Sequence, residues 1–183
     1  RFGSGGTESS NELSVEYKQA YRFYHKELIK FYYRMGYHFV PDLEFYLNFS
    51  SLNCVSRIGG DTALFSRGER YWAQEDLGMI RSWKDFENFP WSKARAMLDE
   101  YGDHLEFLSK NLPDGMKIAT QAAVYEPVME WLFGYTGLFY LVADNPELVK
   151  AVIERVAELV YQSYVIAAQI DGVGVIWHGD DLA

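Results

Sequence analysis

The feature that most constrains the fold is a long amphipathic segment followed directly by a short, continuously apolar run. Residues 146–170 place apolar side chains at helical spacing behind an Asn145-Pro146 opening, with charged side chains on the opposite side. Residues 173–177 then show no polar alternation, which is typical of a strand buried on both faces of a parallel sheet. This end of the chain therefore predicts a helix that returns to a core strand.

The same succession occurs twice earlier in the chain. Helical spacing over residues 17–35 ends at Gly36 and is followed by a predicted strand at 37–40. A second helical pattern over 94–108 precedes a predicted strand at 116–122, and Pro127 is suited to the first turn of another helix. Between these units, residues 71–83 predict a hairpin. Strands separated by helices favour an α/β fold with a parallel sheet.

The predicted strands are too few to close a barrel. A (β/α)8 TIM barrel has eight strands, whereas three are predicted here, and the last one has no helix after it. We therefore expect an α/β fold of the (β/α)8 type, with residues 1–183 forming one incomplete domain that covers roughly its N-terminal half. A small open-sheet protein is the alternative. Residues 1–10, rich in Gly and Ser, are expected to be disordered or introduced by cloning.

Charge and cysteine content narrow the class of protein. The formal net charge of −9 argues against binding to nucleic acid or to an anionic membrane surface. The only cysteine, Cys54, excludes an intramolecular disulfide and suits a cytoplasmic location. The apolar run 137–143 is too short to span a bilayer. Because the predicted sheet has open edges, we also expect aggregation or a homodimer.

Candidate functional residues follow each predicted strand, where active sites of parallel α/β proteins form. Each also has a purely structural explanation: Asp42 could cap a turn, Glu126 could stabilise a helix N-terminus, and Asp180 or Asp181 could cap a helix. Asp180, Asp181 and Asp42 are the candidate catalytic residues. The candidate substrate-binding residues are Glu126, Gln121, Tyr125, His178, Arg57 and Arg70.

Two of these assignments need separate reasoning. Arg57 and Arg70 could bind carboxylate or phosphate groups, or could belong to a solvated loop. His178 lacks the additional histidine or cysteine spacing of a metal site, so no metal ligands are assigned. His25, His38 and His104 lie on predicted helix or strand faces without partners and are interpreted as structural or solvated. No phosphate-binding loop, dinucleotide fingerprint or serine-hydrolase motif occurs.

Four stretches resemble the uroporphyrinogen decarboxylase superfamily. They are residues 36–41, residues 78–86, residues 144–148 and the final segment 172–183 with its Asp180-Asp181 pair. The superfamily contains decarboxylases of porphyrinogens and methyltransferases that move methyl groups between methylcobalamin and a thiol or folate acceptor. The resemblance implies a (β/α)8 barrel with a cleft at the carboxyl ends of its strands.

The resemblance also implies roles for single residues. In the decarboxylases, an aspartate after the first strand faces the pyrrole nitrogens of the substrate, and Asp42 could match it. The Gly-Arg-Tyr pattern of their substrate-binding segment is not found here. Asp180-Asp181 and residues 83–86 look more like the methyltransferase branch.

Three functions follow as hypotheses. The first is methyl transfer involving a corrinoid cofactor such as methylcobalamin or a corrinoid protein, with zinc ligands on strands beyond this sequence. The second is a porphyrinogen carboxy-lyase. The third is a non-catalytic binding or assembly module.

Overall fold

The computed structural model describes residues 7–42, 56–60, 69–73 and 78–180. In chain order the elements are α1 (Thr7–Arg34), β1 (Phe39–Asp42), β2 (Ser56–Gly60), β3 (Glu69–Ala73), α2 (Trp83–Asn88), α3 (Trp91–Ser109), β4 (Lys117–Ala122), α4 (Tyr125–Pro127), the π-helical turn η2 (Val128–Phe133), α5 (Tyr135–Asp144), α6 (Pro146–Ala168) and β5 (Val173–His178). Helix α1 begins at Thr7, inside the Gly/Ser-rich opening 1–10.

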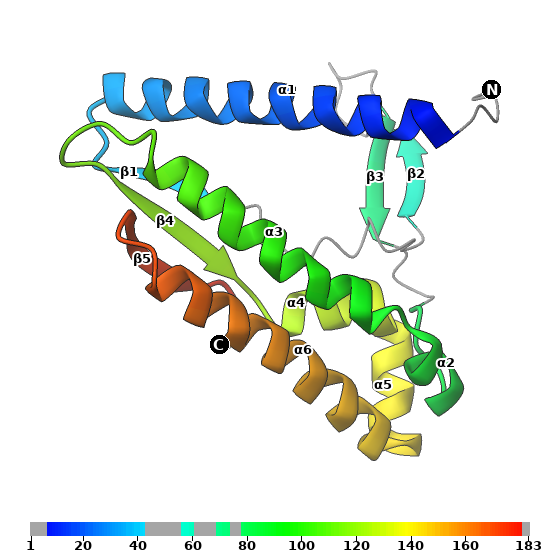
Figure 1. The fold of residues 1–183 in the computed structure, drawn as a ribbon. Coiled ribbons are helices and arrows are strands. Elements are labelled where there is room, and N and C mark those ends of the chain that lie inside the picture. Colours follow the sequence, from blue (N-terminus) through cyan, green and yellow to red (C-terminus); the bar gives the residue numbers. More distant parts are fainter. Residues whose placement is uncertain (1–6, 43–55, 61–68, 74–77, 181–183) are drawn as a thin grey trace.

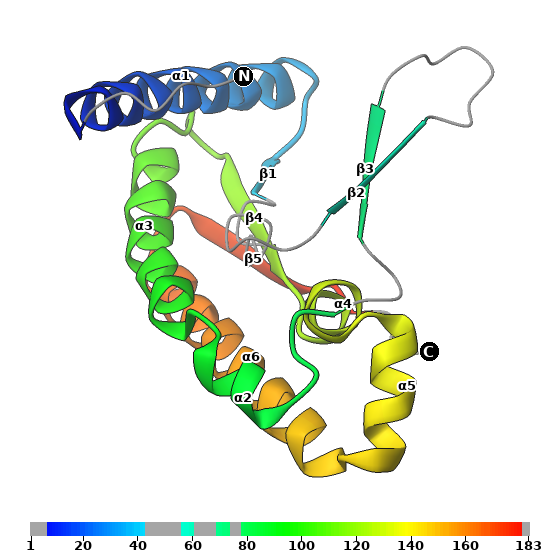
Figure 2. The same ribbon diagram turned by 90° about the vertical axis from the view of Figure 1, so that its right-hand side faces the viewer.

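A parallel sheet of three strands forms the centre of the fold, in the order β1-β4-β5. Residue Val40 pairs with Ile118 on β4, and Gln121 pairs with Trp177 on β5. Strands β4 and β5 match the predicted strands 116–122 and 173–177, whereas β1 lies two residues later than the predicted strand 37–40 and includes Asp42. Helices α1, α3 and α6 lie together on one side of the sheet, and β2–β3 lies apart from them (Figures 1 and 2). The prediction of a parallel α/β sheet is confirmed.

The prediction of a (β/α)8 barrel is wrong for this structure. The described residues form a small α/β domain whose parallel sheet has three strands and stays open. The sequence pattern indicates parallel strands separated by helices, but it does not indicate whether such a sheet closes, because closure depends on strand number and stagger.

The predicted hairpin at 71–83 is also wrong. Strand β3 pairs with the preceding strand β2 in antiparallel orientation, so that Ser56 lies opposite Ala73 and Gly60 lies opposite Glu69. Residues 78–82 instead form a bend that leads into α2, where the side chain of Ser82 accepts a hydrogen bond from the amide of Asp85. Ser82 thus caps α2, and residues 78–82 do not form the second strand of a hairpin.

The core lies between the sheet and its helices. Ile118 of β4 is fully buried, and so are Leu105 of α3 and Val152 and Val156 of α6. The inner face of α6 carries the aliphatic side chains that its sequence predicts, and Asn145 caps its first turn by accepting from the amide of Leu148. Each buried leucine or valine contributes roughly 1.5–3 kcal/mol of transfer free energy.

Candidate functional site

Asp180, two residues beyond β5, organises the turn after the neighbouring strand β4. Its Oδ2 accepts a hydrogen bond from the amide of Val124 at 2.8 Å, and its Oδ1 accepts from the amides of Tyr125 at 3.0 Å and Glu126 at 3.1 Å. The first amides of a helical segment have no partner within that segment, so they need an acceptor from elsewhere. Asp180 supplies it from an adjacent strand, with a side chain only 1% exposed.

The environment of Asp180 favours its ionised form. Burial raises the pKa of the carboxyl group, but the three backbone amides and the nearby His178 together outweigh burial and lower the pKa below its ordinary value. The prediction that Asp180 could cap a helix is thus realised, although the capped segment is α4 rather than a helix that follows Asp180.

His178, the last residue of β5, connects Asp180 to a tyrosine on α6. Its Nε2 lies 2.9 Å from Oδ2 of Asp180, and its Nδ1 lies 2.8 Å from the hydroxyl of Tyr164. The same hydroxyl donates to the carbonyl oxygen of Ala122 at 3.2 Å. The His178 side chain is 41% exposed, so solvent or a ligand can reach it. We call Tyr164, His178 and Asp180 the relay.

The relay accommodates one extra proton without any large movement. Beside an ionised Asp180, Nε2 of His178 carries a proton and donates it to the carboxylate. When the imidazole is neutral, Nδ1 accepts from the Tyr164 hydroxyl. When the imidazole is charged, Nδ1 donates to Tyr164, whose hydroxyl then turns to the carbonyl of Ala122. Burial and the charge of Asp180 raise the pKa of Tyr164, so its hydroxyl stays protonated near neutral pH.

Two other predicted residues border the relay. Gln121 on β4 lies against Gly179, so that a Cβ at Gly179 would require the end of the Gln121 side chain to move. Tyr125 is 40% exposed, and its amide, not its side chain, binds Asp180. Gln121, Tyr125 and the relay therefore meet at the carboxyl ends of β4 and β5.

Glu126 and Glu130 form a carboxylate pair beside this edge. Both side chains are half-buried, one on α4 and the other on η2. Burial raises the pKa of Glu130, and the negative charge of Glu126 raises it further. Sequence reasoning selected Glu126 but missed Glu130, which lies one helical turn further along the chain.

Asp42 lies apart from the relay. Its side chain is fully buried on the helix-covered face of β1, and Oδ1 lies 3.2 Å from Nε2 of His104 on α3. The ring of His104 contacts the ring of His25 on α1 edge-on, with the ring centroids 4.7 Å apart. The interpretation of His25 and His104 as residues without partners is therefore wrong. With Asp42, they join α1 and α3 to the sheet.

A second polar contact lies in the same layer. The hydroxyl of Tyr101 on α3 is hydrogen-bonded to the hydroxyl of Thr120 on β4, and both residues are buried. Burial raises the pKa of Tyr101 above its ordinary value. The layer beneath the sheet therefore uses polar pairs to position α3, which is a structural role.

Three predicted site residues cannot be placed here. Asp181 lies outside the described residues, as do the side chains of Arg57 and Arg70. The backbones of these arginines are described: Arg57 on β2 pairs with Trp72, and Arg70 on β3 pairs with Gly59.

Among the described residues, side chains that could bind a metal ion do not gather at one place. No group of three His, Cys, Asp or Glu side chains within that part of the chain is arranged to hold a metal ion. Both ring nitrogens of His178 are engaged by Asp180 and Tyr164, so neither is directed toward a metal. No helix among the described residues is long and apolar enough to cross a membrane.

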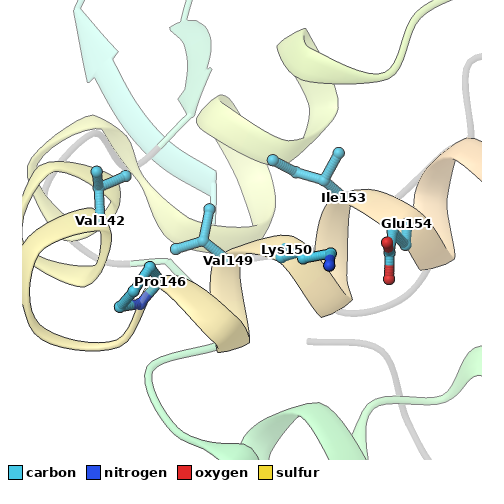
Figure 3. Close-up of a pocket in the computed structure, with 6 residues that line it drawn as sticks. All are labelled: Val142, Pro146, Val149, Lys150, Ile153 and Glu154. Carbon is cyan, nitrogen blue, oxygen red and sulfur yellow. The ribbon is translucent and has the colours of Figure 1, made fainter.

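A shallow hollow between α5 and α6 presents few polar groups to a ligand (Figure 3). It has a volume of about 270 Å³ and is lined by Val142, Pro146, Val149, Lys150, Ile153 and Glu154. Its last lining residue is ten positions before Tyr164 on α6, a rise of about 15 Å. The hollow is almost wholly apolar and is separate from the relay.

Sequence reasoning missed Tyr164, the residue that completes the relay. The helical pattern places it on the inner face of α6 among aliphatic side chains such as Val156 and Val160. A tyrosine hydroxyl on such a face needs a hydrogen-bonding partner, and this requirement could have identified Tyr164 from the sequence. Comparison with known proteins gives no further guidance, because no family model, curated protein or solved structure matches this chain.

Proposed function

We propose that this chain belongs to an enzyme that transfers methyl groups, and that Tyr164, His178 and Asp180 carry the accompanying proton. The observation that carries the proposal is the relay itself: a buried carboxylate, an accessible imidazole and a tyrosine in hydrogen-bonding sequence. It lies at the carboxyl ends of parallel strands, where open α/β sheets bind ligands. The resemblance of Asp180-Asp181 and of residues 83–86 to the methyltransferase branch supports the choice of reaction.

The chemistry requires a base for the acceptor. As a bond forms between the methyl carbon and the thiol sulfur, the bond between the methyl carbon and its donor breaks and its electron pair stays on the donor. The acceptor S–H bond breaks at the same time, and its proton moves to the oxygen of Tyr164. The original proton of Tyr164 moves at the same time to Nδ1 of His178. Asp180, ionised and bonded to Nε2, stabilises the imidazolium that forms.

In this proposal methylcobalamin is a substrate, delivered free or on a separate corrinoid protein. Gln121, Tyr125 and Glu126 border the relay and would orient the acceptor. The proposal does not use Asp42, because that carboxylate is buried against His104.

The test is methyl transfer by the intact natural protein. Methylcobalamin is supplied with thiol or folate acceptors, and the methylated product is quantified. The expected result is turnover that His178→Gln lowers by about 100-fold or more, as loss of an acid–base group does. The matched control is Asp99→Asn, an exposed acid on α3.

Two outcomes would overturn the proposal. One is absence of transfer to any of these acceptors, together with decarboxylation of a porphyrinogen by the same protein. The other is full activity in His178→Gln, which would mean that the relay has only a structural role.

A further inference from the structure

One oxygen of Asp180 binds two partners that belong to different parts of the site. Oδ2 accepts a hydrogen bond from the amide of Val124 at 2.8 Å, and the same oxygen lies 2.9 Å from Nε2 of His178. The other oxygen, Oδ1, accepts from the amides of Tyr125 and Glu126. A single carboxylate therefore joins the imidazole at the end of β5 to the residues after β4. We call Val124, Tyr125 and Glu126 the turn.

The position of the turn depends on this carboxylate. Helix α4 has only three residues, and Val124, its N-cap residue, makes no side-chain cap hydrogen bond. The first amides of a helical segment need an acceptor from elsewhere, and Asp180 is that acceptor. The Asp180 side chain is almost fully buried and Val124 is buried, so water cannot easily replace a hydrogen bond that is lost between them. A small displacement of the carboxylate therefore weakens the hold on the turn.

A proton on His178 displaces the carboxylate. When the imidazole becomes positively charged, its hydrogen bond to Oδ2 joins two opposite charges, which strengthens and shortens it. The carboxylate is then drawn toward Nε2, and the hydrogen bond from Val124 to the same oxygen lengthens. Burial raises the pKa of the Asp180 carboxyl, whereas the three amides and His178 lower it, so both partners act on the same charge.

We propose that Asp180 couples the protonation of His178 to the position of the turn, so that the turn loosens when the imidazole takes up a proton. The coupling is reciprocal, because a ligand that holds the turn in place opposes proton uptake by His178 to the same extent.

The coupling assigns a role to the turn within the proposed methyl transfer. His178 gains its proton as the product forms, so the turn loosens at the product stage and favours product release. The turn carries Tyr125 and Glu126, which border the relay. This consequence rests on the proposed function, whereas the coupling itself depends only on the hydrogen bonds of Asp180.

Other titratable groups around His178 have to be separated from it. Tyr164 on α6 contacts Nδ1 of the imidazole, Glu126 lies on α4, and Glu130 lies on η2. Burial and the negative charge of Glu126 raise the pKa of Glu130, so this carboxyl group is the one most able to disturb α4 on its own account. The variant Glu130→Gln removes its titration and leaves His178 in place.

The test is nuclear magnetic resonance of the intact natural protein, without substrate, between about pH 5 and pH 8, the range in which imidazoles titrate. We expect the amide resonance of Val124 to shift with the same midpoint as the imidazole of His178. The protection of this amide from hydrogen exchange should fall roughly tenfold as the imidazole becomes charged, as the loss of one hydrogen bond to a charged group allows. The amide of Arg81 is the internal control, because it binds the carboxylate of Asp85, which has no histidine partner among the described residues.

Two variants show whether His178 is the source of the response. His178→Gln keeps an amide nitrogen near the position of Nε2 but cannot take up a proton, so the response of Val124 should disappear. Glu130→Gln should leave the response unchanged. A wild-type Val124 amide that does not follow His178 would overturn the proposal, and so would a response that persists in His178→Gln. Because no substrate is present, the result is independent of whether the protein transfers methyl groups.

Discussion

Replacing Asp180 by alanine removes the acceptor for three backbone amides and the anionic partner of His178 in one step. Val124 is buried, so its amide cannot easily form a hydrogen bond with water instead. Tyr125 is exposed, so its amide can. Loss of a helix cap costs about 1 kcal/mol, and loss of a hydrogen bond to a charged group costs about 1.5–3 kcal/mol. We therefore expect Asp180→Ala to lower the free energy of unfolding by about 2–4 kcal/mol.

Urea denaturation at several pH values provides the measurement. The folded-state pKa of Asp180 is lowered, so its stabilisation is present above the ordinary value of 3.8 and is lost as the pH falls through the folded value. The difference in unfolding free energy between wild type and Asp180→Asn should therefore stay constant near neutrality and narrow below pH 3.8. An Asp180→Ala protein within about 0.5 kcal/mol of wild type at pH 7, the range of an ordinary surface substitution, would refute this reasoning.

Three further substitutions test the packing of the fold away from the relay. Asp42→Ala leaves His104 buried without its carboxylate, and we expect a loss of about 3–5 kcal/mol in urea denaturation; a loss below 1 kcal/mol would show that this pair does not stabilise the fold. Gly78→Ala would place a Cβ 1.9 Å from the backbone carbon of Phe133, so that the backbones must separate and the melting temperature should fall steeply. In Gly137→Ala on α5, the new Cβ has no atom within 4 Å, so this substitution should raise the free energy of unfolding by about 0.5–1 kcal/mol. Equal effects of the two glycine substitutions would contradict the close approach of residue 78 to η2.

The local order of the fold can be predicted from sequence with good accuracy. The aliphatic face of α6 and its Asn145 cap depend on neighbouring residues, and both agree with the structure. The apolar run after α6 forms strand β5, but the prediction that this strand is buried on both faces is wrong, because Ile176 and Trp177 are exposed. Barrel closure was not predictable, because it is a property of the whole sheet rather than of any one segment. The hairpin prediction was wrong for a related reason. A strand can pair with a segment before it or after it in the chain, and β3 pairs with β2, which precedes it.

The candidate site was predicted in part. The sequence selects His178 and Asp180 because both follow a strand at its carboxyl end. It does not reveal that Asp180 caps α4, since the bonded amides are 54 to 56 residues away. Asp42 is instead the last residue of β1, and it is directed toward α3 because it lies on the same face of the strand as Val40. Position along a strand, rather than residue type, separates these aspartates.

The central claim is that the Tyr164 hydroxyl passes a proton to His178 during catalysis, and Tyr164→Phe tests it most directly. The measurement is kcat for methyl transfer by the intact protein, with Tyr161→Phe as the matched control, since Tyr161 lies on the same helix and is 60% exposed. The account predicts a fall in kcat of about 100-fold or more for Tyr164→Phe, a loss of only about 1 kcal/mol in stability, and no change for Tyr161→Phe. A Tyr164→Phe protein with the kcat of wild type would contradict it.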